Sequence, residues 1–228
     1  MSKYQSKSIK WALEEIQSGH LLLPAFQRDF VWKHEQIEML FDSLMQGYPI
    51  GSMLFWKLKE DSGRKYRFYR MLSSYQENYR VRSEEVKATL TGADFAVLDG
   101  QQRLTALNIG LCGTYAYRKK YAWVKYSENN YPPRRLYLDI SLCYNEDEDG
   151  KVYHFEFLSG HTEDLFADGE RLWLRVGIII DLNKEARRAF ARDNSLTYEQ
   201  SDMLDDLWDL VWERETISYY PKSGIICT

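Results

Sequence analysis

Residues 95–107, with the sequence FAVLDGQQRLTAL, place an apolar segment, a polar turn and a helical pattern directly after one another. The segment 95–98 is apolar with aromatic and β-branched members, which favours a short strand. Leu104, Leu107 and Leu111 then recur at helical spacing. The stretch therefore predicts a strand that runs into a helix through the turn DGQQR, and the rest of the chain is interpreted around this unit.

The DGQQR turn has the residue types of an anion site. The first backbone N–H groups of a helix have no partner within the helix, so they attract an anion. Gly100 allows a sharp turn and close approach of a ligand, and Arg103 provides a planar donor that suits phosphate. Asp99 fits such a site only if a metal ion, a ribose hydroxyl or a water lies between the two negative charges. The structural alternative is a turn in which Asp99 caps the helix and Arg103 pairs with a surface carboxylate.

A second motif, PAFQRDFVW, lies well upstream at residues 24–32. This motif and DGQQRLT at residues 99–105 resemble the paired signatures of the GmrSD-type restriction endonuclease N-terminal domain family. The segment 173–180 resembles a third, weaker block, so the resemblance covers nearly the whole chain. It implies a fold similar to ParB and sulfiredoxin.

The expected fold class is α+β, with a ParB/sulfiredoxin-like small mixed sheet, flanking helices and a helical C-terminal part. Residues 1–180 would form the ParB-like domain, and residues 181–228 a truncated helical C-terminal subdomain. Full-length members of the family usually carry an HNH nuclease domain downstream. No H-N-H constellation is present in this sequence, so the chain is interpreted as a fragment that needs the missing nuclease domain for DNA cleavage.

The resemblance implies a nucleotide-binding or nucleotide-hydrolysing sensor domain of a modification-dependent antiphage restriction enzyme, which acts with modified or foreign DNA. The base of the nucleoside triphosphate and the DNA modification are not specified by the residues. The implied nucleotide motif consists of Asp99, Gly100, Gln101, Gln102 and Arg103, and the second wall of the pocket of Gln27 and Arg28. Asp99 and Arg103 would be catalytic, because Asp99 could hold Mg²⁺ or orient the attacking water while Arg103 neutralises developing charge.

Two alternatives to a nucleotide hydrolase were considered. The first is a non-catalytic DNA-binding or protein-docking module of a defence system. The second is sulfiredoxin-type phosphoryl chemistry, which needs a cysteine next to the arginine of the motif. Gln102 stands at that position, so this second alternative is set aside.

Basic and aromatic residues alternate in two stretches, a pattern that suits nucleic acid because phosphates take the charge and bases stack on rings. The polar insertion at residues 59–93 contains Arg64, Lys65 and Arg67, and residues 117–126 contain Lys119 and Lys120. These five residues are the candidate DNA contacts. The structural alternative is a solvated surface, because the protein as a whole is acidic, with a net charge of -4.

The composition, with 44% hydrophobic and 28% charged residues, is that of a globular protein. No apolar run is long enough to span a bilayer and the N-terminus lacks a signal-peptide core, so a cytoplasmic protein is expected. Its 3 cysteines are widely spaced and form no C-x-x-C pair, which favours reduced thiols over a disulfide framework or structural zinc.

Local signals place several further elements. An amphipathic helix is expected from Ile9 to Ile16, with Ser6 as its cap and Gly19 past its end. The segment 52–58 should be a central strand next to the strand at 95–98. In the upstream motif, Phe26, Phe30 and Trp32 would be structural anchors under a loop, and Arg28 and Asp29 a solvated pair, unless Gln27 and Arg28 bind a ligand.

The C-terminal half begins with an antiparallel hairpin. Its strands are expected around residues 136–140 and 152–157, with an acidic turn at 146–150 between them. Two helices follow, one capped by Asn183 and one with capping-box spacing between Thr197 and Gln200. The last residues, 225–228, have the composition of a strand.

Overall fold

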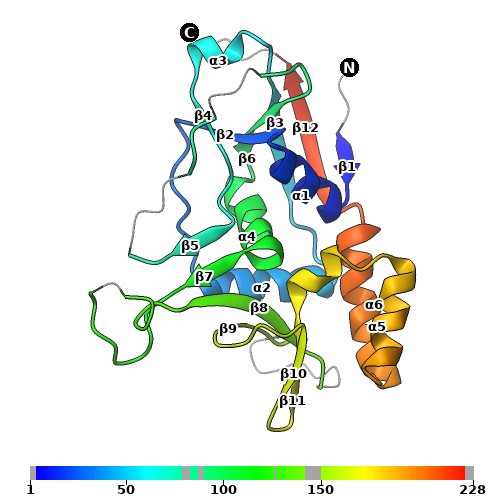
Figure 1. The fold of residues 1–228 in the computed structure, drawn as a ribbon. Helices are drawn as coiled ribbons and strands as arrows, with labels where there is room; N and C mark the ends of the chain where they lie inside the picture. The colour runs from blue at the N-terminus through cyan, green and yellow to red at the C-terminus, as the bar shows by residue number, and fades with distance from the viewer. Residues whose placement is uncertain (1–3, 79–82, 87–89, 126, 142–149, 224–228) are drawn as a thin grey trace.

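The computed structural model describes residues 4–78, 83–86, 90–125, 127–141 and 150–223. They form two mixed sheets with helices between and beside them (Figure 1). The expected α+β class is confirmed, and the single small sheet of the expectation is accompanied by a second sheet.

The first sheet has the strand order β1-β12-β3-β6-β2-β4. These strands are β1 (Gln5–Lys7), β12 (Ile217–Ser223), β3 (Ser52–Lys57), β6 (Phe95–Asp99), β2 (Leu21–Pro24) and β4 (Phe68–Tyr69). β12 is parallel to β3 and β2 is parallel to β6, whereas the other neighbours are antiparallel. Lys57 lies opposite Phe95, so the predicted pairing of the strand at 52–58 with the strand at 95–98 is confirmed.

The second sheet has the strand order β10-β11-β8-β7-β5, and β9 pairs with β8 outside this order. Its strands are β5 (Ser74–Gln76), β7 (Thr114–Ala116), β8 (Pro133–Asp139), β9 (Phe155–Leu158), β10 (Leu165–Asp168) and β11 (Arg171–Arg175). Leu136 faces Phe157 across an antiparallel pair, which confirms the predicted hairpin. Most of the acidic turn predicted at 146–150 lies outside the described residues.

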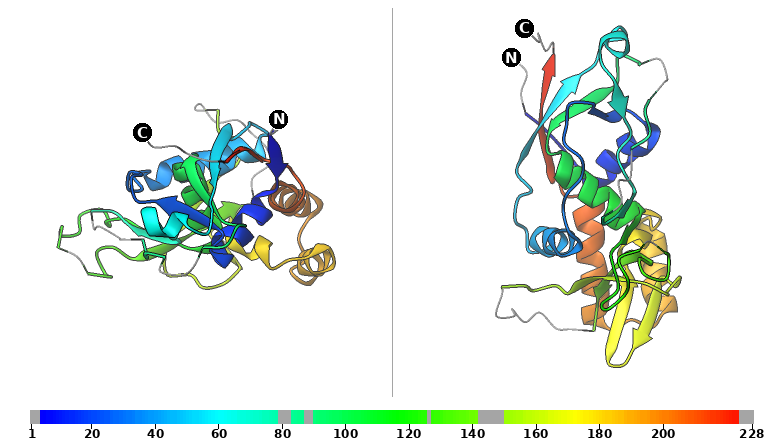
Figure 2. Two further views of the ribbon diagram at one scale, coloured as in Figure 1. Left: turned by 90° about the horizontal axis from the view of Figure 1, so that it is seen from above. Right: turned by 90° about the vertical axis from the view of Figure 1, so that its left-hand side faces the viewer.

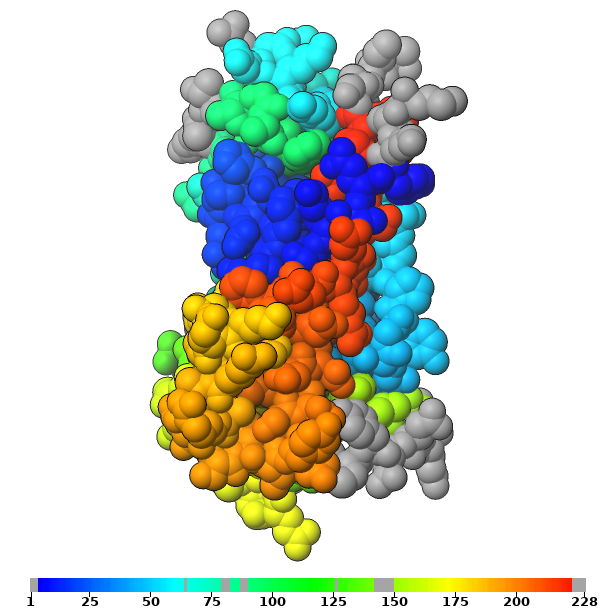
Figure 3. Space-filling view, turned by 90° about the vertical axis from the view of Figure 1, so that its right-hand side faces the viewer, coloured from blue at the N-terminus to red at the C-terminus, as the bar shows by residue number. Residues whose placement is uncertain are grey.

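The helices fill the space between the sheets and cover one side of the molecule. They are α1 (Ile9–Ser18), α2 (His34–Met45), α3 (Ser62–Lys65), α4 (Gln101–Cys112), α5 (Lys184–Asp193), α6 (Tyr198–Trp212) and the 3₁₀ helix η1 (Val176–Ile180). α4 lies in the middle of the molecule in Figure 1 and in the right-hand view of Figure 2, whereas α2 lies toward one edge in the latter view. α5 and α6 form the lower part of the face in Figure 3, with α1 above them.

Local capping explains where three helices begin. The Asn183 side chain accepts a hydrogen bond from the Ala186 amide, and Thr197 and Gln200 form the predicted capping box. At α1 the cap is Ser8, which accepts from the Trp11 amide, so the prediction of Ser6 was wrong. Ser6 instead belongs to β1, because residues 5–7 pair with residues 217–219 of β12, a long-range contact that local spacing does not reveal.

The C-terminal part is helical only in its first section. After α5 and α6 the chain returns as β12 and lies between β1 and β3 inside the first sheet. Ile217 is 0% and Tyr219 2% exposed, so β12 belongs to the main core. The division of the chain into residues 1–180 and 181–228 stays a prediction, and residues 225–228 lie outside the described structure.

Two further sequence expectations concern cysteines and membranes. Cys112 is a free thiol, and burial raises its pKa. Cys143 and Cys227 lie outside the described residues. Within the residues that the structure describes, no helix combines the length and apolar character needed to cross a membrane.

Candidate functional site

The DGQQR turn joins β6 to α4 as the sequence predicts. β6 ends at Asp99, Gly100 takes the cap position with φ 95°, and α4 begins at Gln101. A Cβ atom on residue 100 would lie 2.6 Å from the Cγ atom of the buried Met53. Glycine is therefore needed both for the left-handed backbone and for close packing against β3.

Arg103 connects this turn to the beginning of β3. Its Nη1 donates to the Ile50 carbonyl oxygen at 2.6 Å, and its Nη2 donates to the Ser52 carbonyl oxygen at 3.2 Å. Nη2 also lies 3.3 Å from the carboxylate of Asp99, whose side chain is 71% exposed. The guanidinium thus has protein partners on two sides, and the Asp99 carboxylate faces largely toward solvent.

Three glutamines bind the upstream motif to the turn. Gln101 Nε2 donates to the carbonyl oxygen of Arg28 at 2.5 Å, and Gln27 Nε2 donates to the carbonyl oxygen of Leu98 at 2.8 Å. Gln102 makes two bonds, with Oε1 accepting from the Val31 amide and Nε2 donating to the Asp29 carbonyl oxygen. The two motifs, far apart in the sequence, are therefore in direct contact.

A cavity of about 740 Å³ lies beside this contact. Its walls come from the end of β2 and the loop after it, from β4 and the segment around β5, and from the first turns of α4. The lining residues are Leu23, Pro24, Ala25, Gln27, Arg28, Asp29, Phe30, Arg67, Tyr69, Leu72, Tyr75, Asn78, Ser83, Glu85, Gln101 and Thr105. Gln27, Arg28 and Gln101 of the predicted site line the cavity, whereas Asp99, Gly100, Gln102 and Arg103 do not.

Two polar atoms on the α4 wall of the cavity are buried and have no hydrogen-bond partner among the residues that the structure describes. They are Gln101 Oε1 and Thr105 Oγ1, on residues that are 7% and 1% exposed. Spaced four residues apart on one helix, they lie on the same face of α4. Because a buried polar group without a partner costs about 1–3 kcal/mol, these atoms are suited to receive a ligand.

Charged and aromatic side chains complete the cavity. Arg28 is exposed and forms no ion pair with any described residue, and Arg67 lies 3.8 Å from the Glu85 carboxylate. Phe30 and Tyr75 meet edge to face, with ring centroids 5.0 Å apart. The cavity thus offers cations for an anionic ligand and flat aromatic surfaces for a ring.

The loop after β2 differs from its predicted structural role. Phe30 is buried and Trp32 is half-buried, but Phe26 is 61% exposed, so the prediction that Phe26 is an anchor was wrong. The loop is held by hydrogen bonds from the glutamines and by Phe30, and it has no need of a third aromatic anchor.

No group of three or more His, Cys, Asp or Glu side chains is arranged to hold a metal ion in the part of the chain that the structure describes. Asp99, the predicted Mg²⁺ ligand, is a single carboxylate. Mg²⁺ commonly binds through one or two carboxylates together with substrate phosphates and water, so Asp99 suits a metal that arrives with a nucleotide.

The five candidate DNA contacts lie in two separate places. Lys65 in α3 and Arg67 after it lie near the top of the molecule in Figure 1, and Lys119 and Lys120 lie on the loop after β7 at the lower left. Arg64 belongs to α3, and its side chain is outside the described structure. Lys65 pairs with Asp61 at 3.4 Å, so part of the upper group is neutralised within the protein.

A smaller hollow of about 190 Å³ contains several titratable groups. His34, Glu38, Tyr117, His154 and Glu156 contribute to its wall. Burial raises the pKa of Glu38 to about 7, against the opposing effect of a hydrogen bond from the Phe157 amide at 3.1 Å. Burial lowers the pKa values of His34 and His154.

Sequence reasoning missed part of the cavity wall. Thr105 was not predicted, although its spacing of four residues from Gln101 was a usable signal for a shared helix face. Tyr69 and Tyr75 were placed in a nucleic-acid insertion, but here they line the same cavity as Arg28. No local signal links that insertion to the motif at residues 24–32.

Comparison with known proteins places this geometry in a family. The sequence model of the GmrSD restriction endonuclease N-terminal domain matches residues 9–219 of the chain. The chain belongs to this family. The match includes both motifs, all strands of the cavity wall and the first part of β12, residues 217–219, and the family implies the context of a restriction system.

The chain also matches part of a longer protein. The chain is similar to the uncharacterized protein MJ0686 of Methanocaldococcus jannaschii, with 26% identity over 152 residues. The aligned region is 66% of this chain and 23% of that protein. The GmrSD N-terminal domain described here thus matches about a quarter of the length of the relative, and the activity of such a whole protein enters only as a proposal.

Proposed function

We propose that this chain is the nucleotide-binding sensor domain of a modification-dependent restriction enzyme that acts with DNA, and that the 740 Å³ cavity receives a nucleoside triphosphate. The observation that carries the proposal is the pair of buried atoms Gln101 Oε1 and Thr105 Oγ1 on the cavity wall, near Arg28. None of the described residues bonds to either atom or forms an ion pair with Arg28. Unpaired buried acceptors and donors next to a free cation suit a polar, anionic ligand.

The size and lining of the cavity support a nucleotide. Small-molecule sites usually measure about 300–1,000 Å³ and combine aromatic walls with a few convergent polar groups. Tyr69, Tyr75 and Phe30 offer surfaces for a base, and Arg28 and Arg67 offer guanidinium groups for phosphates. Gln101 Oε1 can accept a hydrogen bond from an amino or hydroxyl group of the ligand.

Hydrolysis is the second part of the proposal. Asp99 does not line the cavity, so hydrolysis requires that the phosphates lie at the Gln101 end of the cavity and extend toward the turn of Asp99 and Gly100. The exposed Asp99 carboxylate would hold Mg²⁺ or orient a water, and the ion would supply charge neutralisation at the phosphates. Arg103 would contribute positive charge as well as fix the turn through the carbonyl groups of Ile50 and Ser52.

The binding step is tested by calorimetric titration of the chain with ATP, GTP, CTP and UTP in the presence of Mg²⁺. Arg28→Ala should weaken binding by about 1.5–3 kcal/mol, the usual loss for a charge-assisted hydrogen bond. Gln101→Leu should also weaken it, because leucine cannot accept a hydrogen bond. Arg188→Ala is the matched control, since Arg188 is another exposed arginine but lies on α5. Equal affinity in all variants, or no binding of any nucleotide, would contradict the proposal.

The hydrolysis step is tested by phosphate release from the nucleotide that binds. Asp99→Asn and Arg103→Ala should lower kcat by roughly 10²-fold or more if they stabilise the transition state. A folding control is needed for Arg103, because it also holds the turn, so thermal unfolding of each variant is measured in parallel. Full turnover in both folded variants would limit the function to nucleotide binding.

The alternative of a non-catalytic DNA-binding module is favoured by one specific observation. Tyr121 and Trp123, on the loop with Lys119 and Lys120, are 92% and 84% exposed. This alternative predicts salt-sensitive DNA binding that does not depend on nucleotide. The sensor proposal predicts instead that the same chain binds both nucleotide and DNA.

A further inference from the structure

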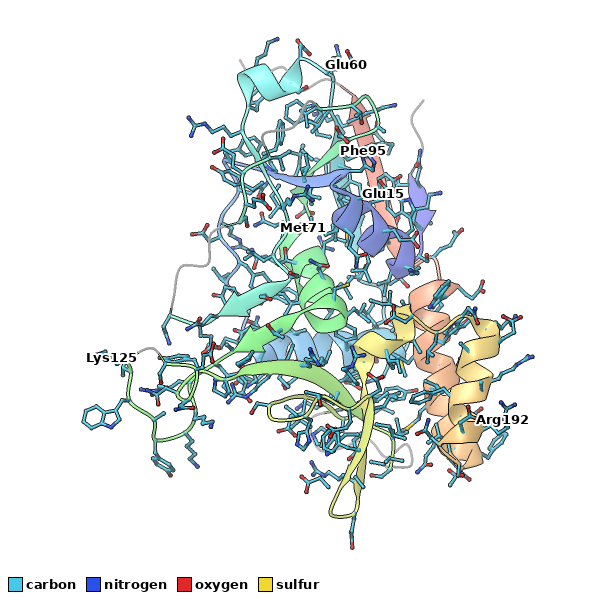
Figure 4. The ribbon with its side chains drawn as sticks, in the orientation of Figure 1. Glu15, Glu60, Met71, Phe95, Lys125 and Arg192 are labelled. Atoms are coloured by element: carbon cyan, nitrogen blue, oxygen red, sulfur yellow. The ribbon has the colours of Figure 1, made fainter. Side chains whose placement is uncertain are left out.

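Between β7 and β8, the described residues 117–125 and 127–132 form a loop that projects from the body of the molecule. Figures 1 and 4 show it reaching outward at the lower left, and Figure 4 labels Lys125 on it. Tyr121 is 92%, Trp123 84% and Val124 65% exposed, the largest run of exposed apolar side chains among the described residues. Exposed apolar groups that cluster in this way on a soluble domain commonly mark an interaction site.

The base of this loop is held in place by the protein. The Lys119 amide donates to the Asn130 carbonyl oxygen at 2.8 Å, and Asn130 Nδ2 donates to the Lys125 carbonyl oxygen at 2.9 Å. Tyr131 is 1% exposed, and its hydroxyl donates to the Val124 carbonyl oxygen at 3.3 Å. The exposed rings are therefore presented by an internally bonded loop.

The neck of the loop is fixed in the same way. The Arg134 guanidinium lies 3.6 Å from the ring centroid of Tyr117 and donates to the Tyr117 carbonyl oxygen at 2.8 Å. At the tip, Tyr121 has a positive φ of 67°, a backbone conformation that costs free energy in a residue with a side chain. Tyr121 is thus an exposed residue with a strained backbone, on a loop whose base is fixed by hydrogen bonds. This placement suits contact with a partner better than stabilisation of the fold.

The charge of the loop is opposite to that of the protein. Arg118, Lys119, Lys120 and Lys125 are exposed, and none forms an ion pair with another residue that the structure describes. The Lys120 ammonium lies 5.3 Å from the Tyr121 ring centroid. In the upper basic group, by contrast, Lys65 pairs with Asp61 and Arg67 with Glu85. Among the described candidate DNA contacts, the cations on the projecting loop are the ones without a carboxylate partner in the described part of the chain.

We propose that the loop of residues 117–132 is a DNA-binding element that takes single-stranded or locally unstacked DNA, with Trp123 and Tyr121 stacking on bases and the four cations contacting phosphates. Aromatic rings interleaved with free cations are the surface that binds accessible bases without sequence preference. The inference rests on the DNA-acting part of the proposed function and on the restriction family to which the chain belongs. It does not depend on the nucleotide cavity.

The test is fluorescence anisotropy of the chain with a labelled single-stranded oligodeoxynucleotide and with the matching duplex, over a series of salt concentrations. The single strand should bind more tightly, and Trp123→Ala should weaken its binding roughly 5- to 150-fold, the usual effect of losing one stacked base. Trp123→Phe keeps a ring and should restore most of the affinity. Tyr198→Ala on α6 is the matched control, because Tyr198 is 78% exposed and lies away from the loop.

The charge contribution has its own pair of variants. The double substitution Lys119→Gln and Lys120→Gln should reduce the slope of log affinity against log salt by about 1.4, from two lost phosphate contacts. The matched double substitution Lys184→Gln and Arg188→Gln, at two exposed cations on α5, should leave the slope unchanged. Unchanged binding in the Trp123→Ala and Lys119/Lys120 variants, or an equal loss in the two controls, would overturn the proposal.

Two further experiments distinguish DNA binding by this loop from lipid binding and from nucleotide binding in the cavity. Sedimentation with phosphatidylcholine–phosphatidylserine vesicles tests the same loop against lipid, and vesicle binding without DNA binding would overturn the proposal. Nucleotide titration of Trp123→Ala should match that of the unsubstituted chain. If DNA binding behaves as expected while no nucleotide binds, the cavity proposal fails and the loop proposal stands; the reverse result overturns the loop proposal alone.

Discussion

Glu38 on α2 is a carboxyl group whose protonation should be visible in the stability of the protein. Burial raises its pKa to about 7 in the folded chain, against a reference value of 4.5. The nearby Glu156 and Glu35 raise the pKa further, while Lys151 and the Phe157 amide lower it. The folded protein therefore keeps a proton that the unfolded chain releases between about pH 4.5 and pH 7.

The raised pKa of Glu38 in the folded protein determines the direction in which stability changes with pH. Because the folded pKa is the higher one, the contribution of Glu38 to stability is complete below about pH 4.5 and is lost as the pH rises through about 7. Glu38→Gln cannot titrate and retains an oxygen that can accept from the Phe157 amide. Between pH 5 and pH 8, we expect the unfolding free energy of the unsubstituted chain to fall relative to this variant by about 1–2 kcal/mol, allowing for solvent screening.

Urea denaturation of both proteins at the two pH values measures this difference. Taking the difference between the proteins at each pH removes the effect of all other titrating groups. An unchanged difference, or one that shifts in favour of the unsubstituted chain at high pH, would contradict the prediction.

Single residues also mark the limit of sequence reasoning. The caps Asn183 and Thr197 could be predicted because their partners lie three residues away, and the glycine requirement at position 100 follows from the sharpness of the turn. The partners of Arg103 could not, since the Ile50 and Ser52 carbonyl groups meet it only after β3 and β6 pair. Sequence alone therefore does not tell whether the Arg103 guanidinium binds a ligand or neighbouring backbone carbonyl groups.

At the scale of elements, the loop after β2 is coupled to α4 by side-chain amides. Gln102 bonds to both the amide of Val31 and the carbonyl group of Asp29, at 3.0 and 3.1 Å. In Gln102→Leu the shape of the side chain is similar but both bonds are lost. We expect the Val31 amide to exchange its hydrogen at least about fivefold faster, which corresponds to the loss of about 1 kcal/mol of local hydrogen bonding.

Hydrogen exchange followed by NMR or mass spectrometry measures this effect. The amide of Leu22 serves as an internal control, because β2 is paired with β6 upstream of the loop. A similar acceleration at Leu22 and Val31 would indicate global destabilisation and would contradict a local role for Gln102.

The existence of most elements could be read from the sequence, but their assembly into a cavity could not. Helical spacing in α1 and α2 and the strand at 95–98 depend on neighbouring residues only. The cavity depends on Tyr69 and Tyr75 meeting Arg28 and Gln101, and these come from three separate segments of the chain. The choice of the loop at residues 119–125 over residues 64–67 likewise depended on the structure, because Lys65 and Arg67 have carboxylate partners that the sequence does not reveal.

At the scale of the whole molecule, β12 makes the C-terminal region part of the first sheet. A chain of residues 1–180 lacks α6 and β12, so β1 loses its partner and β3 loses one neighbour. We expect residues 1–180 to unfold without a cooperative transition, because the buried Ile217 and Tyr219 are missing from the core. Residues 1–223 should unfold cooperatively, like the complete chain.

Circular dichroism during heating distinguishes the two truncated chains. A sharp thermal transition for residues 1–180 would show that this segment is a domain of its own, and would contradict the dependence on β12. Pro221 is compatible with this central position because it lies beyond the end of β1, where β12 is paired with β3 alone among the described strands.

The antiparallel pairing of β1 with β12 also determines how the molecule would respond to a mechanical load. Gln5 faces Tyr219 and Lys7 faces Ile217, so the first residue of β1 and the last residues of β12 lie toward the same end of the sheet. A pulling force applied through residues 4 and 223 would therefore act on the outermost hydrogen bond of the pair first and open the bonds one after another. Hydrogen bonds that break one at a time in this way resist little force. Tension on the ends would therefore detach β1 from β12 first, while the parallel pair of β12 and β3, which is loaded along its strands, stays intact.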